Sequence, residues 1–262
     1  MSTALPTGVS ITPIPAFVDN YIWCFYDDKR CVVVDPGDAK PVVTFCQQHQ
    51  LELTAVLITH HHADHTGGLP ELCKHWPGLR VIGPQNPKIT HLNETVTEND
   101  SVEIKQLGLL FKVIEIPGHT LDHIGFIGHG GVLCGDTLFS AGCGRLFEGS
   151  PEQMRQSLAK LSALPDTTLV WCTHEYTLAN MDFARAVEPN NAALMERLTW
   201  AQTQREADQP TLPSKISIEK AINPFLRSHS AEIQQSVQRH ENRDVESELE
   251  VFTAVRAWKD NF

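Results

Sequence analysis

The sequence predicts an α/β domain rich in short strands, followed by an all-helical region. Two observations predict this fold class. Up to about residue 172, short apolar runs alternate with turns rich in Gly, Pro and Asp, and a few segments with helical spacing interrupt them. After Cys172 the apolar residues recur at helical spacing instead. We therefore expect a first domain of residues 1–172 and a helical domain of residues 173–262.

Turn residues bound the strands of the first domain. Asp35-Pro-Gly-Asp38 and Gly128-His-Gly-Gly131 are two such turns, and Gly108 is expected to interrupt one long apolar run. The expected strands are 9–14, 21–26, 31–35, 53–58, 80–82, 102–116, 124–127, 132–134 and 168–172.

Capping residues and apolar stripes predict the helices. Ser150 can cap a helix that has Pro151 at its first position. A stripe near the C-terminus predicts a packed helix face and consists of Val245, Leu249, Phe252, Val255 and Trp258. The expected helices are 40–49, 68–75, 151–163, 178–187, 191–206, 230–240 and 245–258, with connectors around 209–213 and 222–227.

Composition excludes several classes of protein. The 262 residues carry 21 Lys+Arg against 32 Asp+Glu, a net charge of −11, which disfavours nucleic acid as a partner. No apolar run approaches the roughly 18 residues that a membrane-spanning helix needs, and the N-terminus has no basic segment followed by an apolar stretch. The seven cysteines form no CxxC motif and lie mostly in apolar segments, as buried thiols do in a reducing compartment. We expect a cytoplasmic protein that binds neither nucleic acid nor membranes.

Histidine is the unusual component, with 13 residues. The richest segment, Thr59-His-His-His-Ala-Asp-His65, follows the expected strand 53–58. His60, His62 and Asp64 recur at a spacing of two, so they project the same way only from extended backbone. His61 should then point away, toward solvent or a partner side chain. Four imidazoles and one carboxylate this close together repel one another when the rings protonate, and a divalent cation compensates for that cost. The segment therefore predicts a metal site.

Three more polar residues follow apolar strands directly. They are His119 after Pro117-Gly118, Asp136 after Cys134-Gly135, and His174 after Cys172-Thr173. Sites built from the ends of several strands are common in enzymes because a rigid sheet positions their loops. Asp35, Asp38 and Asp122 are interpreted as turn residues or as partners of the ligands, and His123 and His129 receive no ligand role.

These residues resemble the signature of the metallo-β-lactamase superfamily. Within it, the chain resembles the glyoxalase II (hydroxyacylglutathione hydrolase) family along nearly its whole length, most specifically in residues 135–149, 173–180 and 223–227. The resemblance implies a metallo-β-lactamase-type αββα four-layer sandwich with an all-α C-terminal domain. It also implies two divalent metal ions, with zinc favoured and mixed Fe/Zn as an alternative.

The resemblance assigns the ligands and the chemistry. His60, His62 and His119 hold one metal, Asp64, His65 and His174 hold the second, and Asp136 bridges the two. A metal-bridging hydroxide, oriented by Asp64, attacks the thioester of an S-(2-hydroxyacyl)glutathione such as S-D-lactoylglutathione. The products are glutathione and D-lactate, in the second step of methylglyoxal detoxification. Because a thiol leaves as a thiolate, the reaction needs no strong general acid.

The family's glutathione contacts correspond to Arg145, Phe147, Tyr176 and Arg227. Two departures bear on substrate affinity: Phe147 stands where some members have tyrosine, and no lysine shortly follows Arg227. The alternatives are another hydrolase of the same fold (a lactonase, another thioesterase or a nuclease), a persulfide dioxygenase, and a non-catalytic metal- or glutathione-binding module. A monomer is favoured over an oligomer.

Overall fold

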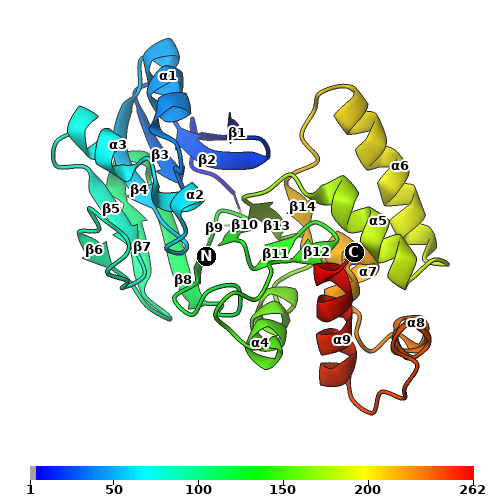
Figure 1. The fold of residues 1–262 in the computed structure, drawn as a ribbon. Coiled ribbons are helices and arrows are strands. Elements are labelled where there is room, and N and C mark those ends of the chain that lie inside the picture. Colours follow the sequence, from blue (N-terminus) through cyan, green and yellow to red (C-terminus); the bar gives the residue numbers. More distant parts are fainter. Residues whose placement is uncertain (1–3) are drawn as a thin grey trace. The chain divides into compact units, whose positions relative to one another are not determined.

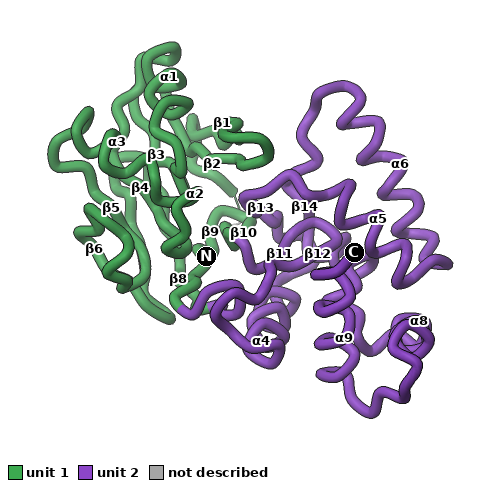
Figure 2. The backbone as a smooth tube through the Cα atoms, in the orientation of Figure 1, with its two compact units in different colours: residues 1–115, 122–135 green, residues 116–121, 136–262 purple. Residues whose placement is uncertain are grey.

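The computed structural model of the chain describes residues 4–262 and divides it into two compact units (Figure 2). Unit 1 contains the described residues up to Glu115 together with Asp122–Gly135, and unit 2 contains Ile116–Leu121 and Asp136–Phe262. These units differ from the division at residue 172, which stays a prediction. Among the described residues, no helix is long and apolar enough to cross a membrane.

Unit 1 is built on strands of two sheets. Six strands form the first sheet in the order β1-β2-β3-β4-β5-β6, and four neighbouring strands of the second follow the order β10-β9-β8-β7. The strands of the first sheet are β1 (Ser10–Ala16), β2 (Asn20–Tyr26), β3 (Arg30–Val34), β4 (Glu52–Leu57), β5 (Arg80–Gly83) and β6 (Glu94–Thr95). The others are β7 (Ser101–Ile104), β8 (Leu109–Glu115), β9 (Ile124–Gly128) and β10 (Gly131–Gly135).

The alternation of side chains decides which face of the first sheet meets which layer. Cys31 and Val33 of β3 pack with α1 (Ala39–His49) and α3 (Leu69–His75), which lie on the same side of the sheet (Figure 1). Phe25 of β2 points the other way and contacts Phe111 of β8, with ring centroids 5.5 Å apart. Both faces are therefore buried, which is why β2 and β3 read as continuous apolar runs.

Parallel pairing places the functional loops of unit 1. Strand β4 pairs in parallel with β3 and β5, so the three strands end at the same edge of the sheet. Asp35 follows β3 and the histidine-rich segment follows β4. The helix after β3 also begins at this edge. Asp38 caps α1 by accepting a hydrogen bond from the backbone N–H of Lys40.

Unit 2 contains most of the helices and two small pairs of strands. Its strands are β11 (Leu138–Phe139), β12 (Gly142–Cys143), β13 (Leu169–Cys172) and β14 (Ser214–Lys215). Its helices are α4 (Pro151–Ser162), α5 (Thr177–Val187), α6 (Ala192–Glu206), α7 (Ile216–Ile222), the 3₁₀ helix η2 (Pro224–Leu226), α8 (Ala231–Glu241) and α9 (Glu248–Asp260).

Most of the expected elements are present, with two corrections in the C-terminal region. The predicted cap at Ser150 is confirmed, including a reciprocal bond with Gln153. The break expected near Gly108 in the run 102–116 is also confirmed: the short 3₁₀ helix η1 (Lys105–Leu107) ends at Gly108 and separates β7 from β8. The last helix starts at Glu248 rather than at Val245, because Ser247 caps it. The region expected to be all-helical also contains β14, which pairs with β13.

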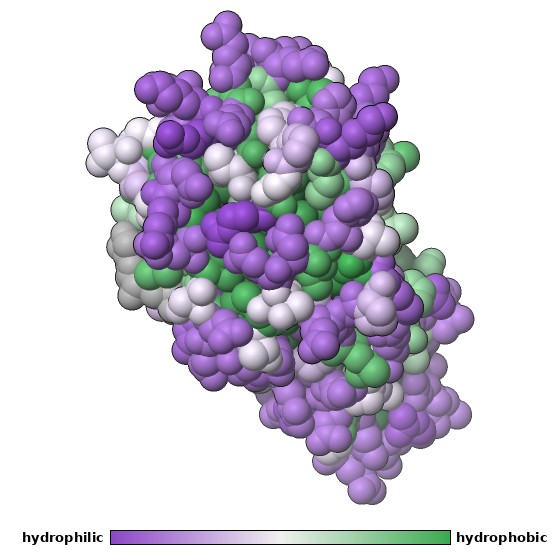
Figure 3. All heavy atoms as spheres, turned by 90° about the vertical axis from the view of Figure 1, so that its left-hand side faces the viewer, coloured by the Kyte–Doolittle hydropathy of each residue, from purple (hydrophilic) through white to green (hydrophobic). Residues whose placement is uncertain are grey.

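The surface fits the composition. Figure 3 shows a face dominated by hydrophilic residues, with hydrophobic atoms in smaller areas between them.

All seven cysteines are free thiols, and six of them are buried, whereas Cys73 is partly exposed. The expectation of buried thiols rather than disulfides is thus confirmed.

Candidate metal centre

Unit 1 carries the first set of metal donors, in the segment after β4. Nε2 of His60 lies 3.2 Å from Nδ1 of His62, and Nε2 of His65 lies 3.4 Å from Oδ2 of Asp64. The backbone of His62 is extended as expected, but α2 (Ala63–Thr66) begins one residue later. Asp64 and His65 are therefore helical, and the extended spacing predicted to reach Asp64 ends at His62.

A buried carboxylate, Asp35, orients two of these histidines. It accepts hydrogen bonds from the backbone N–H and the hydroxyl of Thr59, both at 2.7 Å, and lies 3.1 Å from Nδ1 of His65. Because the Thr59 hydroxyl donates to Asp35, its oxygen accepts from Nδ1 of His60, 3.1 Å away. The Thr59 oxygen thereby favours a proton on Nδ1 of His60, and the Asp35 carboxylate beside Nδ1 of His65 favours a proton there. This leaves Nε2 of each ring as the atom for a metal.

Two further residues hold the donors of unit 1 in place. Asn20, at the start of β2, approaches Oδ2 of Asp64 with its side-chain amide at 3.3 Å. The ring of His123 is buried and stacks on the ring of His60, with centroids 4.6 Å apart. The role of Asn20 is not predictable from its only sequence signal, a polar residue that opens an apolar strand, and the contact of His123 with His60 is likewise visible only in the structure.

His61 points away from the donors, as its place in the segment predicts. Its Nδ1 lies 2.9 Å from Oδ1 of Asp122, and the Lys88 ammonium lies 3.1 Å from its Nε2. Asp122 also accepts from the Asn86 amide at 2.9 Å. His61 therefore ties the segment to neighbouring loops.

Glycines allow the two loops at this edge to touch. A Cβ on Gly37 would lie 1.9 Å from the carbonyl oxygen of Asp64, and one on Gly68 would lie 2.5 Å from the carbonyl oxygen of Pro36. The backbone of the β3–α1 loop is thus packed directly against that of the donor segment, which only residues without a side chain permit.

Unit 2 carries the second set of donors: His119, Asp136 and His174. Oδ2 of Asp136 lies 3.4 Å from Nε2 of His119 and 3.2 Å from Nε2 of His174. All three side chains are buried. Nδ1 of His119 donates to the carbonyl oxygen of Arg145 at 2.7 Å, so its Nε2 is the atom left for a metal.

Both donor sets suit divalent cations. Two ligands of a tetrahedral metal at about 2.0–2.1 Å lie about 3.3 Å apart. The pairs above are separated by 3.2–3.4 Å. Imidazole nitrogens and carboxylate oxygens are also the donors that Zn, Fe and Mn accept. The residues present therefore fit bound metal ions.

Three of the four expected substrate contacts line the second set. Phe147 meets the His119 ring edge-on with centroids 5.3 Å apart, and Tyr176 stacks on His174 at 4.6 Å. The Arg145 guanidinium lies 5.9 Å from the centre of the Phe147 ring. These side chains are 37–62% exposed, so they are open to a ligand.

Arg227 is placed differently. Its Nε and Nη2 both donate to Glu188, at 2.9 and 2.7 Å, and its Nη1 donates to the carbonyl oxygen of Lys220. The bonds to Glu188 raise the pKa of this guanidinium. Its fork is therefore engaged within the protein. Arg145 is 61% exposed and has only a longer ion pair, from its Nε to Asp260 at 3.7 Å.

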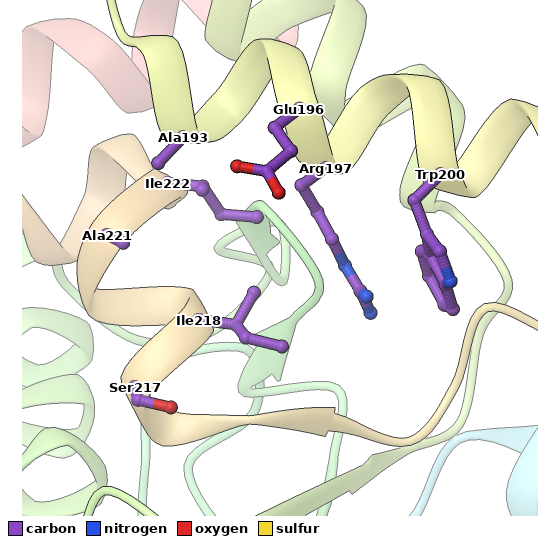
Figure 4. A pocket seen from close by; sticks show the side chains of 8 residues that line it. All are labelled: Ala193, Glu196, Arg197, Trp200, Ser217, Ile218, Ala221 and Ile222. Carbon is purple, nitrogen blue, oxygen red and sulfur yellow. The ribbon is translucent and has the colours of Figure 1, made fainter.

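Unit 2 also has a cavity of about 370 Å³ between α6 and α7 (Figure 4). Arg197 lies over the Trp200 ring, 3.4 Å from its centre, beside the apolar side chains of Ile218 and Ile222. None of the candidate ligands lines it.

Comparison with known proteins assigns the chain to a class and then to a family. Residues 17–174 match the Metallo-beta-lactamase superfamily, and residues 175–262 match the Hydroxyacylglutathione hydrolase C-terminus. The chain is thus a metallo-beta-lactamase-fold protein with a C-terminal helical region, as expected. It belongs to the hydroxyacylglutathione hydrolase family.

Individual relatives support this assignment over the full length. The hydroxyacylglutathione hydrolase of Vibrio campbellii is 51% identical, covering 97% of this chain and 100% of that protein. That of Shewanella halifaxensis is 49% identical with the same coverage. Among solved structures, ETHE1 from Myxococcus xanthus matches with a TM-score of 0.63 and 25% identity, covering 96% of this chain and 97% of that one.

Proposed function

We propose that the chain hydrolyses the thioester of S-(2-hydroxyacyl)glutathione, such as S-D-lactoylglutathione, to glutathione and a 2-hydroxy acid. The observation that carries this proposal is the wall beside the second donor set. There Phe147 packs on His119, Tyr176 packs on His174, and Arg145 offers an exposed cation. A thioester with a flexible, anionic thiol portion suits this wall. Family membership over the whole chain supports the same substrate.

The two donor sets are proposed to form one centre for two metal ions. His60, His62 and His119 would hold one ion, Asp64, His65 and His174 the other, and Asp136 would bridge. The position of Asp136 supports its bridging role, since its Oδ2 already lies near Nε2 of two histidines. Bound there, divalent ions would activate a water molecule near neutral pH and polarise the thioester carbonyl.

The protein's own groups then orient the reactants. Asn20 holds the Asp64 carboxylate, 44% of which is exposed, so that it can accept a hydrogen bond from the attacking water. Arg145 is proposed to bind a glutathione carboxylate as a bidentate fork. Arg227 is proposed as a weaker contact, because its Nε and Nη2 already donate to Glu188. The departing thiolate needs little protonation, so the site needs no strong acid.

Zinc is the proposed metal, with mixed Fe/Zn as the alternative, because the donors suit both. A monomeric, cytoplasmic enzyme is proposed, and the free thiols agree with a reducing compartment. The net charge of −11 supports the absence of a nucleic-acid partner.

The test is a hydrolysis assay with S-D-lactoylglutathione, run beside elemental analysis, before and after chelation and after zinc is returned. We expect turnover that disappears on chelation and returns with metal. Asp136→Ala should abolish both turnover and the two-metal content, whereas Asp166→Ala, at an exposed ion pair with Lys220, should change neither.

The proposal is rejected if the metal-loaded protein leaves this thioester intact while it opens a lactone or cleaves another substrate. Retention of two tightly bound ions in Asp136→Ala would refute the ligand assignment.

A further inference from the structure

A short hairpin in unit 2 connects a metal donor to the substrate wall. Strands β11 and β12 pair only at Leu138↔Cys143 and Phe139↔Gly142. Asp136 precedes this hairpin and Arg145 follows it. A two-stranded ribbon of this length is too small to hold its own conformation in water. Other parts of the protein must therefore fix it.

Four buried side chains of the helical region hold the hairpin backbone. Together they bond to every residue from 139 to 143. Asn180 donates to the Ser140 carbonyl (3.1 Å), Glu219 accepts from the Ala141 N–H (2.8 Å), Asn223 donates to the carbonyls of Phe139 (3.1 Å) and Gly142 (2.9 Å), and Arg256 donates to the Cys143 carbonyl (2.9 Å). We call these four side chains the hairpin clamp.

The clamp is built into the protein interior. Glu219 and Asn223 have no exposed surface, and Asn180 and Arg256 are 5% and 6% exposed. Burial raises the pKa of Glu219, although the hydrogen bonds that it accepts from Ser214, Ala141 and Asn223 act to lower it. Burying polar groups this deeply costs folding free energy unless they are hydrogen-bonded. The four side chains therefore depend on their hydrogen bonds to the hairpin.

The hairpin itself depends on the clamp. Ala141 has a φ of 56°, which is unfavourable for a residue with a side chain, and its N–H is the one that Glu219 holds. A Cβ on Gly142 would lie 2.5 Å from Nδ2 of Asn180. Backbone strain and close approach thus occur where the clamp bonds.

Phe139 transmits the position of the hairpin to the site. Its ring meets the His174 ring at 5.8 Å and the Tyr176 ring at 5.4 Å, both nearly perpendicular. The chain after the hairpin carries Arg145, whose carbonyl orients His119. A displaced hairpin would therefore move the Tyr176 ring and Arg145 together.

We propose that Asn180, Glu219, Asn223 and Arg256 are positioning residues that fix the hairpin 138–143 and, through it, the glutathione-binding wall of Arg145, Phe147 and Tyr176. This inference rests on the proposed function for the identity of the substrate.

The test compares variants of the clamp in the metal-loaded full chain. Asn223→Asp keeps the shape but replaces the amide that donates to two carbonyls, and Asn180→Ala is a milder second variant. Glu219→Gln is the conservative variant, because its amide oxygen can still accept from Ala141. The matched control is Asn93→Ala in unit 1, where the amide donates to the Leu79 carbonyl and accepts from the Val81 N–H.

Two readouts separate positioning from general stability. Hydrogen exchange of the amides in residues 138–146 reports the hairpin without any substrate. Kinetics compare S-D-lactoylglutathione with an S-lactoyl thioester of a small uncharged thiol, which needs the metals but not the wall. We expect Asn223→Asp and Asn180→Ala to speed exchange and to raise KM for the glutathione thioester by about tenfold or more. Turnover of the small thioester and the metal content should fall by a smaller factor, because His119 and His174 meet the hairpin and the chain after it through one contact each. Glu219→Gln and Asn93→Ala should stay near wild type in every readout.

Unchanged exchange in 138–146 in both clamp variants would overturn the inference. Equal losses on both thioesters would overturn it too, because they would show a general structural role. If the wild type hydrolyses no glutathione thioester, the proposed function fails, and hydrogen exchange alone still decides whether the clamp fixes the hairpin.

Discussion

Asp35 shows how much of this site depends on a residue that binds no metal. Its two carboxylate oxygens accept hydrogen bonds from Thr59, and one of them lies beside Nδ1 of His65. The Thr59 hydroxyl in turn contacts Nδ1 of His60. A ligand with the wrong tautomer presents N–H instead of a lone pair to the metal. One carboxylate therefore decides whether two imidazoles can bind.

We expect Asp35→Asn to weaken metal binding about 10- to 100-fold, because the amide would place a donor against His65 and favour the wrong tautomer. Competition with a coloured chelator measures the affinity. Asp38→Asn is the control, since asparagine caps a helix as well as aspartate does. Wild-type affinity in Asp35→Asn would contradict the role assigned to this carboxylate.

The two arginines should differ in their effect on catalysis. Arg145→Ala is expected to raise KM for the glutathione thioester about 10- to 100-fold with little change in kcat, since a charge-assisted bond to substrate is lost. Steady-state kinetics of Arg145→Ala and of Arg185→Ala, an exposed arginine paired with Asp182, measure this. An equal effect of both substitutions would mean that Arg145 acts only through net charge.

At the scale of elements, Glu188 connects the ends of several helices. It follows α5, and it accepts from Asn191 at the start of α6, from Arg227 after η2 and from Ser230 before α8. Burial alone would raise its pKa, but these hydrogen bonds outweigh burial and hold the pKa of Glu188 below its ordinary value.

This shift predicts how stability depends on pH. A carboxyl group whose pKa is lower in the folded state than in the unfolded state stabilises the folded protein. This stabilisation is complete above the unfolded pKa, here near 4.5, and is lost as the pH falls through the folded pKa. Glu188→Gln should cost about 2–3 kcal/mol at pH 7, and the difference from wild type should shrink below pH 4.5. Urea unfolding of the metal-free proteins at pH 7 and at lower pH measures it, with Asp166→Asn as the exposed control.

Elements were predictable where periodicity extends over a turn of helix or a full strand. Ser150 and Pro151 place the start of α4 correctly. In contrast, α7 escaped prediction because the buried Glu219 interrupts its apolar stripe between Ile216 and Ile222. Strands β11, β12 and β14, of two residues each, are too short to show a period. Strand β14 exists only through its pairing with β13, more than 40 residues earlier in the chain.

At the scale of the whole molecule, metal binding should contribute to folding, because the proposed donor sets are assembled only in the folded chain. Ions that bind only the folded state also stabilise it by mass action.

We expect the metal-loaded protein to unfold in one calorimetric transition. Chelation should lower the midpoint by on the order of 10 °C. Returning zinc should restore the midpoint. Identical transitions with and without metal would contradict metal binding at the two donor sets.

The sequence by itself determined the fold class, because strand and helix periodicities are local. It also predicted the donor residues, because histidine and aspartate concentrate where a metal would compensate for their repulsion. It also placed His61 away from the donors. Tertiary structure alone decided which nitrogen of each ring is available, since Asp35 and the Arg145 carbonyl reach those rings from other loops. It alone revealed the hairpin clamp, because hydrogen bonds between Asn223 and residues more than 80 positions away leave no local pattern.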